Sequence, residues 1–162
     1  MPETPHPILL HLESVAQTAK LAGAFARAMQ AGDVVLLTGG LAAGKTLFVR
    51  EAVAALGSKD AVSSPTYTLA HIYGSPKGPV VHVDAYRLES AADFADLALE
   101  DEVEQGLAFI EWGELLAGAF ESYVGLSLAL DPMVENARTA TLTAHGSRGA
   151  ALLAQVLKGS KS

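Results

Sequence analysis

Residues 34–46 of the chain have the sequence VVLLTGGLAAGKT, and this stretch decides the fold. Its first four residues form a continuous β-rich run, which is typical of a strand covered on both faces in a parallel sheet. From Gly39 to Thr46 it matches the pattern G-x-x-x-x-G-K-[ST] without a mismatch. Glycines let the backbone turn tightly and point its N–H groups at an anion, and the following helix adds the positive end of its dipole. The stretch therefore predicts a strand, a phosphate-binding loop and a helix from about Lys45 to Leu56.

The residues of this loop predict the binding of ATP with Mg²⁺. The Lys45 ammonium is expected to reach the β- and γ-phosphates, and the Thr46 hydroxyl to hold the metal ion. We expect the whole loop to contact the nucleotide: Gly39, Gly40, Leu41, Ala42, Ala43, Gly44, Lys45 and Thr46. A guanine-selective GTPase would carry N-K-x-D, whereas the single asparagine, Asn136, is followed by Ala137. This disfavours GTP.

The flanking segments predict one α/β domain over residues 1–162, with residues 158–162 as a frayed tail. Glu13 or Ser14 can cap a helix whose apolar residues recur every three or four positions up to Met29. Further strands are expected at residues 8–12, 66–73, 80–83, 107–110, 123–130 and 138–144, and helices at 91–99 and 150–157. The fold class is a P-loop NTPase-type three-layer sandwich, with a central, mostly parallel sheet and late antiparallel strands.

Two carboxylates follow predicted strands directly. Asp84 comes after residues 80–83, and Glu111 comes after residues 107–110. Open α/β sheets bind their ligands at the carboxyl ends of the strands, and Mg²⁺ in a P-loop protein needs an acid there. Both residues are therefore candidates for the metal and for hydrolysis. Their spacing leaves open which one binds the metal and which one orients the attacking water.

Two further residues near these positions are candidates for the site. Thr66 lies after the loop helix, where other P-loop proteins carry a switch threonine that senses Mg²⁺ and the γ-phosphate; a simple turn is the alternative. Trp112, the single tryptophan, adjoins Glu111 and is expected to contact the nucleotide or a partner, with core packing as the alternative. The five histidines lack metal-ligand spacing, and each is expected to be an ordinary surface or packing residue.

Composition restricts the partners. The net charge is −7 and the pI is about 5.1, so strong direct binding to nucleic acid or to an anionic membrane is not expected. An acidic chain can still act on RNA through a basic partner. The absence of cysteine excludes disulfides, thiolate nucleophiles and cysteine-ligated zinc. No apolar run approaches the roughly 18 residues of a membrane span, and the N-terminus lacks the features of a signal peptide, which predicts a cytoplasmic location.

Four segments together resemble one family. They are the phosphate loop, VSSPTYTL at residues 62–69, HVDAYRL at 82–88 and FIEW at 109–112. Their order and spacing resemble the bacterial TsaE family, formerly YjeE, which are small P-loop ATPases required to make threonylcarbamoyladenosine in tRNAs that read codons beginning with adenine. The similarity extends from the helix containing Thr18 to the late strand around Arg138. These two residues are included as candidate nucleotide contacts.

The resemblance implies a Mg²⁺-dependent ATPase that is slow alone and works with two partner proteins, TsaB and TsaD. TsaD transfers the threonylcarbamoyl group to tRNA, and the ATP cycle of TsaE lets the TsaD–TsaB assembly turn over, so that tRNA is met only indirectly. By the same resemblance, Lys45 and Thr46 serve phosphate and Mg²⁺, and Asp84 and Glu111 serve the metal and hydrolysis. Thr66 would be the switch residue, and Trp112 would lie near the nucleotide or the interface.

Three residues depart from the family pattern, whose loop usually has the sequence G-D-L-G-A-G-K-T. Gly40 replaces its aspartate and Ala42 replaces a glycine, so the extra methyl group is expected to weaken phosphate binding. Gly113 stands where a proline usually follows Glu-Trp, which is expected to loosen that turn.

Two other functions remain open at this point. A small-molecule kinase would commonly close a basic lid over the phosphates, and the chain has only 11 Lys and Arg residues without an arginine cluster after the core. A nucleotide-gated binding module that barely hydrolyses ATP differs from the ATPase mainly in degree. Whether the protein is an ATPase or a nucleotide-gated module, ATP is expected to order the Thr66 segment and so build the surface on which the partner docks.

Overall fold

The computed structural model describes residues 6–40, 43–63 and 69–160. Leu41, Ala42 and Thr66 therefore lie outside the described residues. Among the helices of the described ranges, none is both long enough and apolar enough to cross a membrane.

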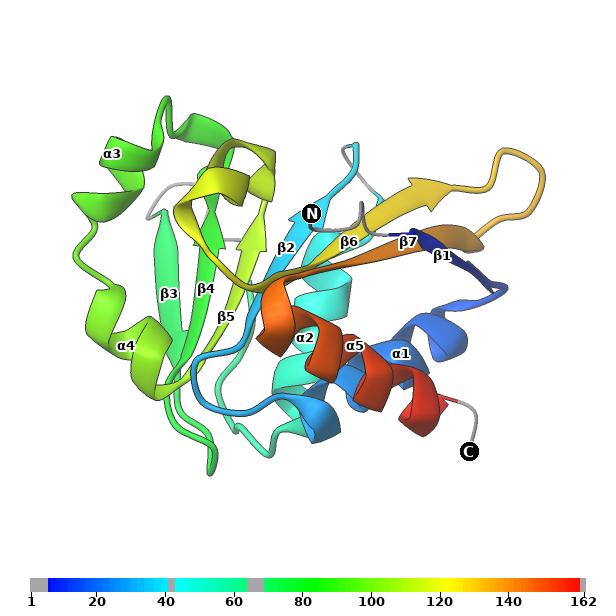
Figure 1. Ribbon diagram of the computed structural model, residues 1–162. Coiled ribbons are helices and arrows are strands. Elements are labelled where there is room, and N and C mark those ends of the chain that lie inside the picture. The colour runs from blue at the N-terminus through cyan, green and yellow to red at the C-terminus, as the bar shows by residue number, and fades with distance from the viewer. Residues whose placement is uncertain (1–5, 41–42, 64–68, 161–162) are drawn as a thin grey trace.

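The described strands form one seven-stranded sheet, shown in Figure 1. In spatial order they are β1 (Ile8–Leu12), β7 (Arg138–His145), β6 (Tyr123–Leu130), β2 (Val34–Thr38), β5 (Leu107–Glu111), β4 (Val80–Asp84) and β3 (Ala70–Tyr73). The four central strands, β6, β2, β5 and β4, run parallel to one another. The pairs β1–β7, β6–β7 and β3–β4 are antiparallel, so the sheet is mixed, and its mostly parallel character belongs to the centre.

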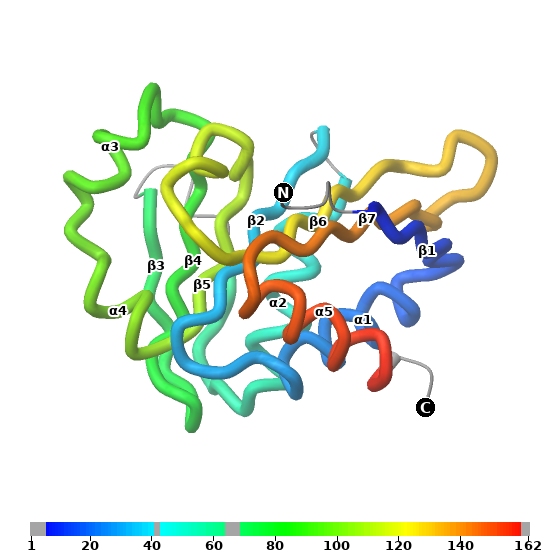
Figure 2. The backbone as a smooth tube through the Cα atoms, viewed as in Figure 1, coloured from blue at the N-terminus to red at the C-terminus, as the bar shows by residue number. Residues whose placement is uncertain are grey.

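Helices cover both faces of the central strands, which gives three layers. One face carries α1 (Val15–Ala28), α2 (Lys45–Ala55) and α5 (Gly146–Ser160). The other carries the shorter elements η1 (Ala85–Arg87), α3 (Ala91–Ala95), α4 (Glu100–Gln105) and η2 (Gly113–Ala119). In Figure 2 the backbones of α1, α2 and α5 lie together, well apart from α3 and α4.

The two cores explain the apolar run of β2. Val35 and Leu37 pack in the core with α1, α2 and α5, whereas Val34 and Leu36 pack in the core with α4 and η2. Successive side chains of a strand point to opposite faces, so a strand covered on both faces needs apolar residues at every position. The packing of β2 anchors the strand end of the phosphate-loop segment. The helix end is anchored by Phe48 of α2, which packs edge-on against Phe25 and Phe109.

Several predicted boundaries shift. Ser14 caps α1, its hydroxyl accepting the Gln17 N–H at 3.2 Å. The helix predicted at residues 91–99 ends at Ala95, because Ala98 adopts a left-handed φ of 54° that breaks the helical path before α4 begins. At the other end of the chain α5 begins at Gly146 and extends to Ser160, beyond the predicted limits of 150 and 157. The expectation of a frayed tail is therefore wrong for residues 158–160, which continue the helix.

Candidate functional site

The glycines of the phosphate loop occupy positions that a side chain would spoil. Gly39, just after β2, has a φ of 138°, and a Cβ there would lie 2.4 Å from the Leu128 carbonyl oxygen. Gly44 is the N-cap of α2 with a φ of 102°, a left-handed conformation that L residues with a side chain rarely adopt. The first and last glycines of the motif therefore shape the turn, and α2 begins at Lys45 as predicted.

Lys45 is held against its own loop. Its side chain is buried, and its Nζ donates to the carbonyl oxygens of Gly39 at 2.6 Å and Gly40 at 2.9 Å. The Trp112 ring lies over the ammonium, with 4.0 Å between Nζ and the ring centroid. Burial lowers the pKa of Lys45, and the nearby carboxylates of Glu111, Glu114 and Asp84 oppose that shift. The loop thus holds a buried cation beside its glycine turn.

Thr46 and the two strand-end carboxylates come together beside this lysine. The Thr46 hydroxyl donates to Oε1 of Glu111 at 2.9 Å, and Asp84 is the register partner of Glu111 on the neighbouring strand. Oδ1 of Asp84 accepts the Tyr86 N–H at 3.0 Å, which caps η1. Both residues are almost fully buried, at 5% exposed for Asp84 and 3% for Glu111. Burial of two acids at one edge of the sheet is costly unless a cation compensates.

The donor set fits Mg²⁺. Mg²⁺ prefers oxygen ligands, and it is commonly held by one or two carboxylates while phosphates and water complete its coordination. The hydroxyl of Thr46 and the carboxylates of Asp84 and Glu111 provide oxygen donors of this kind. Within the described residues there is no group of three or more His, Cys, Asp or Glu side chains that could hold a metal ion by itself.

His82 is a site residue that the sequence analysis missed. It is fully buried, with Nε2 at 2.5 Å from Oε2 of Glu111 and Nδ1 at 3.2 Å from the Tyr73 hydroxyl. The expectation that each histidine is an ordinary surface or packing residue did not foresee this contact of the buried His82 with Glu111. The available signal was its position two residues before Asp84 in a strand, because residues i and i+2 lie on one face of a sheet.

Trp112 adjoins the loop, as its sequence position predicts. It adopts a left-handed backbone conformation with a φ of 60°, and its ring contacts both Lys45 and Tyr86, with 5.1 Å between the two aromatic ring centroids. Gly113 follows and is closely packed, since a Cβ there would lie 2.8 Å from the Cβ of Leu36. A side chain at this residue would clash with Leu36, and the expected loosening of the turn stays a prediction. A direct contact of Trp112 with the nucleotide stays a prediction.

Arg138 and Thr18, the two outlying candidates, differ in their surroundings. Arg138 is the first residue of β7, and its Nε donates to the Ala43 carbonyl oxygen of the phosphate loop at 2.9 Å. Thr18 is 2% exposed within α1, and its hydroxyl donates to the Ser14 carbonyl oxygen at 3.4 Å. The structure thus joins Arg138 to the loop, while the role of Thr18 stays a prediction.

A strand, a glycine loop and a helix, with two acids on the adjoining strand ends, define a protein of the P-loop NTPase-like class. The chain matches the family model "Threonylcarbamoyl adenosine biosynthesis protein TsaE" over residues 12–140. It therefore belongs to the TsaE family, as the sequence motifs indicate.

Individual relatives agree with this assignment. The chain is 35% identical to the tRNA threonylcarbamoyladenosine biosynthesis protein TsaE of Treponema pallidum, an alignment covering 80% of this chain and 95% of that protein. It is 38% identical to the protein of the same name from Streptomyces coelicolor, covering 83% and 95%. The crystal structure of Bacillus subtilis YdiB superposes with a TM-score of 0.77 at 23% identity, covering 97% of this chain and 98% of that one, which shows the shared fold.

Proposed function

We propose that this protein is a Mg²⁺-dependent ATPase of the tRNA threonylcarbamoyladenosine system, which binds and hydrolyses ATP to support turnover of the TsaB–TsaD threonylcarbamoyl transferase assembly. One observation carries the proposal. Glu111 accepts the hydroxyl of the loop residue Thr46 at 2.9 Å, while Asp84 stands at the register position beside it. This is the arrangement that a nucleotide-bound Mg²⁺ needs, assembled from three separate elements.

Binding begins with the loop and Lys45. The backbone N–H groups of the loop and the N-terminus of α2 favour a triphosphate. Lys45 would exchange its bonds to the Gly39 and Gly40 carbonyl oxygens for bonds to phosphate oxygens, which carry more negative charge. The Trp112 ring lies over the ammonium, so we expect the ring to move when phosphates bind to Lys45.

Hydrolysis is assigned to the carboxylate pair. Thr46, Asp84 and Glu111 are the residues that would hold Mg²⁺, directly or through water, and the bound ion would neutralise charge on the phosphate oxygens. One of the two acids would hold the metal while the other orients the attacking water. Thr66, outside the described residues, is the proposed switch residue that links the state of the nucleotide to the partners.

The partners are proposed to be TsaB and TsaD. With a net charge of −7, the chain has little attraction for tRNA itself, so its contact with tRNA is proposed to pass through that assembly. An ATPase without a small-molecule substrate must couple hydrolysis to another molecule, and this chain is proposed to do so in the cytoplasm by docking on the transferase.

ATP hydrolysis by the purified protein, with and without purified TsaB and TsaD, tests the proposal. We expect a slow basal rate that rises on mixing and is lost in Lys45→Ala and Asp84→Ala. Lys59→Ala removes a charge at an exposed residue away from the loop and serves as the matched control. No change on mixing, together with full activity of Asp84→Ala, would refute the assignment. Transfer of phosphate to an added sugar or nucleoside would identify a kinase instead.

A further inference from the structure

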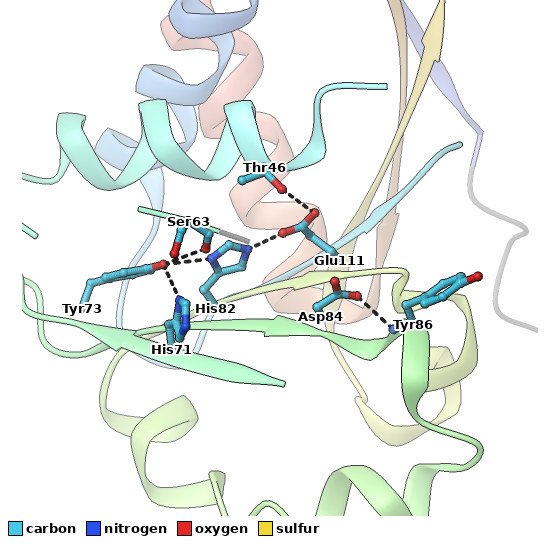
Figure 3. A network of polar contacts seen from close by, with 8 residues as sticks. All are labelled: Thr46, Ser63, His71, Tyr73, His82, Asp84, Tyr86 and Glu111. Carbon is cyan, nitrogen blue, oxygen red and sulfur yellow. Dashed lines mark hydrogen bonds and ion pairs between the residues drawn. The ribbon is translucent and has the colours of Figure 1, made fainter. Parts of the chain in front are cut away.

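A line of polar side chains leads from the phosphate loop across three strands to the edge of the sheet. Thr46 donates to Oε1 of Glu111, and His82 contacts Oε2 of the same carboxylate. The other ring nitrogen of His82 contacts the hydroxyl of Tyr73, which in turn lies 3.2 Å from Nδ1 of His71. Figure 3 shows these side chains pointing toward one another from α2, β5, β4 and β3.

The chemistry of these groups gives the line a direction. As a carboxylate, Glu111 only accepts hydrogen bonds, so His82 donates its Nε2–H to it. The Tyr73 hydroxyl has one proton and two acceptors within reach: the Ser63 carbonyl oxygen at 3.4 Å and, when Nδ1 of His82 carries no proton, that nitrogen at the shorter distance of 3.2 Å. Burial raises the pKa of Tyr73, which keeps its proton in place at neutral pH. His71 can donate to the Tyr73 oxygen from the outer end of the line.

Two residues of this line, His82 and Tyr73, differ from ordinary core residues because they are buried and carry polar groups. His82 has no exposed surface and Tyr73 is 4% exposed, yet both polar groups are hydrogen-bonded to a neighbour that leads to the site. His82 contacts Oε2 of Glu111, so this carboxylate oxygen is hydrogen-bonded within the protein. The carboxylate can therefore keep a single orientation, with one oxygen on His82 and the other on Thr46.

We propose that Tyr73 and His82 are positioning residues for Glu111: Tyr73 sets the tautomer of His82, and His82 holds the carboxylate in the orientation that reaches Thr46. The inference rests on the proposed ATPase function, in which Glu111 serves the metal or the attacking water. The inference gives residues of β3 and β4 a role in hydrolysis, which is to orient the carboxylate of Glu111.

The first test is spectroscopic and does not need activity. We expect ¹⁵N NMR of the imidazole nitrogens to show His82 as the neutral Nε2–H tautomer in the nucleotide-free protein. In Tyr73→Phe the Nδ1 resonance should move toward that of an unbonded acceptor, because its donor is gone. Tyr123→Phe, in the tyrosine stacked on His145, is the matched control and should leave His82 unchanged. If His82 proved to be cationic, or if its Nδ1 resonance were the same in Tyr73→Phe as in the wild type, the proposal that Tyr73 sets the tautomer of His82 would be overturned.

The second test separates positioning from simple packing. His82→Leu removes the donor, and we expect kcat for ATP hydrolysis to fall by about 10- to 100-fold while KM for ATP changes by less than about threefold. In His82→Gln the amide nitrogen can replace Nε2, so most of the lost kcat should return. An unchanged kcat in a folded His82→Leu, or equal losses in the leucine and glutamine variants, would contradict the proposal. Should the leucine variant not fold, Tyr73→Phe and His82→Gln carry the comparison.

The two tests also separate this inference from the proposed function. If the wild-type protein hydrolyses no ATP even with its partners, the ATPase proposal fails, and the NMR experiment still decides whether Tyr73 sets the His82 tautomer. If ATP is hydrolysed and the His82 variants keep full kcat, the function stands and the positioning role is refuted.

Discussion

The two halves of the sheet have different burial patterns, although they belong to one continuous set of strands. In β4 and β5 every residue is buried, whereas β6 and β7 have buried residues at alternate positions over part of their length and partly or fully exposed residues elsewhere. Helices cover both faces of the first half, while one face of the β1–β7–β6 half is left partly open. A strand covered on both faces can carry polar groups only where they are paired.

The difference shows where chemistry is concentrated in this molecule. Six polar or charged residues are buried within the described part of the chain, and four of them belong to the site: Lys45, His82, Asp84 and Glu111. All four lie at or beside β2, β4 and β5. On the other half, Thr139, Thr141 and Thr143 of β7 are only partly buried on the open face, where water can solvate their hydroxyls. The candidate catalytic residues therefore lie in the half formed by β2, β5 and β4, called the covered half below. The half formed by β1, β7 and β6, called the open half, supports it structurally.

The largest effect should come from removing an acid in the covered half. Glu111→Ala takes away the carboxylate that Thr46 and His82 both contact, so hydrolysis should fall by about 10²- to 10³-fold in a single-turnover assay. ATP binding, followed by Trp112 fluorescence, should change much less. If Glu111→Ala hydrolysed ATP at the wild-type rate, the assignment of hydrolysis to the buried acids of the covered half would be wrong.

Gly39→Ala tests the shape of the loop between the two halves. The added Cβ would lie 2.4 Å from the Leu128 carbonyl oxygen, at a φ that disfavours alanine, and we expect a loss of about 2–3 kcal/mol in the free energy of unfolding. Gly40→Ala is the control, because its Cβ would meet no described atom within 4 Å. Thermal or urea unfolding of the two variants makes the comparison, and similar losses in both would show the clash to be irrelevant.

Lys77→Met probes a tether between the β3–β4 hairpin and the helical layer. The Lys77 ammonium donates to the carbonyl oxygens of Ala26, Arg27 and Met29 at 2.7–2.9 Å, at the C-terminal end of α1. Loss of these charge-assisted bonds at a helix terminus should cost about 1–2 kcal/mol of stability. Lys59→Met is the matched control at an exposed position, and equal unfolding midpoints for both variants would argue against the tether.

Arg138→Met asks whether the open half contributes to nucleotide binding at all. Its guanidinium donates to the Ala43 carbonyl oxygen from the first residue of β7. We expect a loss of roughly tenfold in ATP affinity, corresponding to about 1.4 kcal/mol for a charge-assisted bond that supports the loop. Isothermal titration with ATP measures it. An unchanged affinity would confine the nucleotide site to the covered half.

The smallest effect is expected on the open face. Thr141→Val exchanges a partly exposed hydroxyl for a methyl group in β7, and both stability and hydrolysis should stay within about 0.5 kcal/mol of wild type. A large loss of partner-stimulated activity, with normal basal hydrolysis, would instead show that this face contacts the transferase.

Much of the site could be predicted because its parts lie at recognisable points of local structure. Asp84 and Glu111 each end an apolar run, and the loop motif lies between a strand and a helix. His82 and Tyr73 could not be assigned in this way. Histidine and tyrosine within a strand are compatible with ordinary packing, and their partners lie 29 and 9 residues away in the sequence. The left-handed turn at Trp112 and the break at Ala98 are likewise set by their surroundings.

The sequence by itself determined the strand–loop–helix unit and the family, because apolar periodicity, glycine turns and short motifs act over a few neighbouring residues. The tertiary structure alone decided the order of the strands, which places β5 between β2 and β4. That order brings Glu111 within hydrogen-bonding distance of Thr46, 65 residues earlier, and of His82 on the next strand. Strand order depends on contacts between segments far apart in the chain, and no local pattern encodes which strands become neighbours.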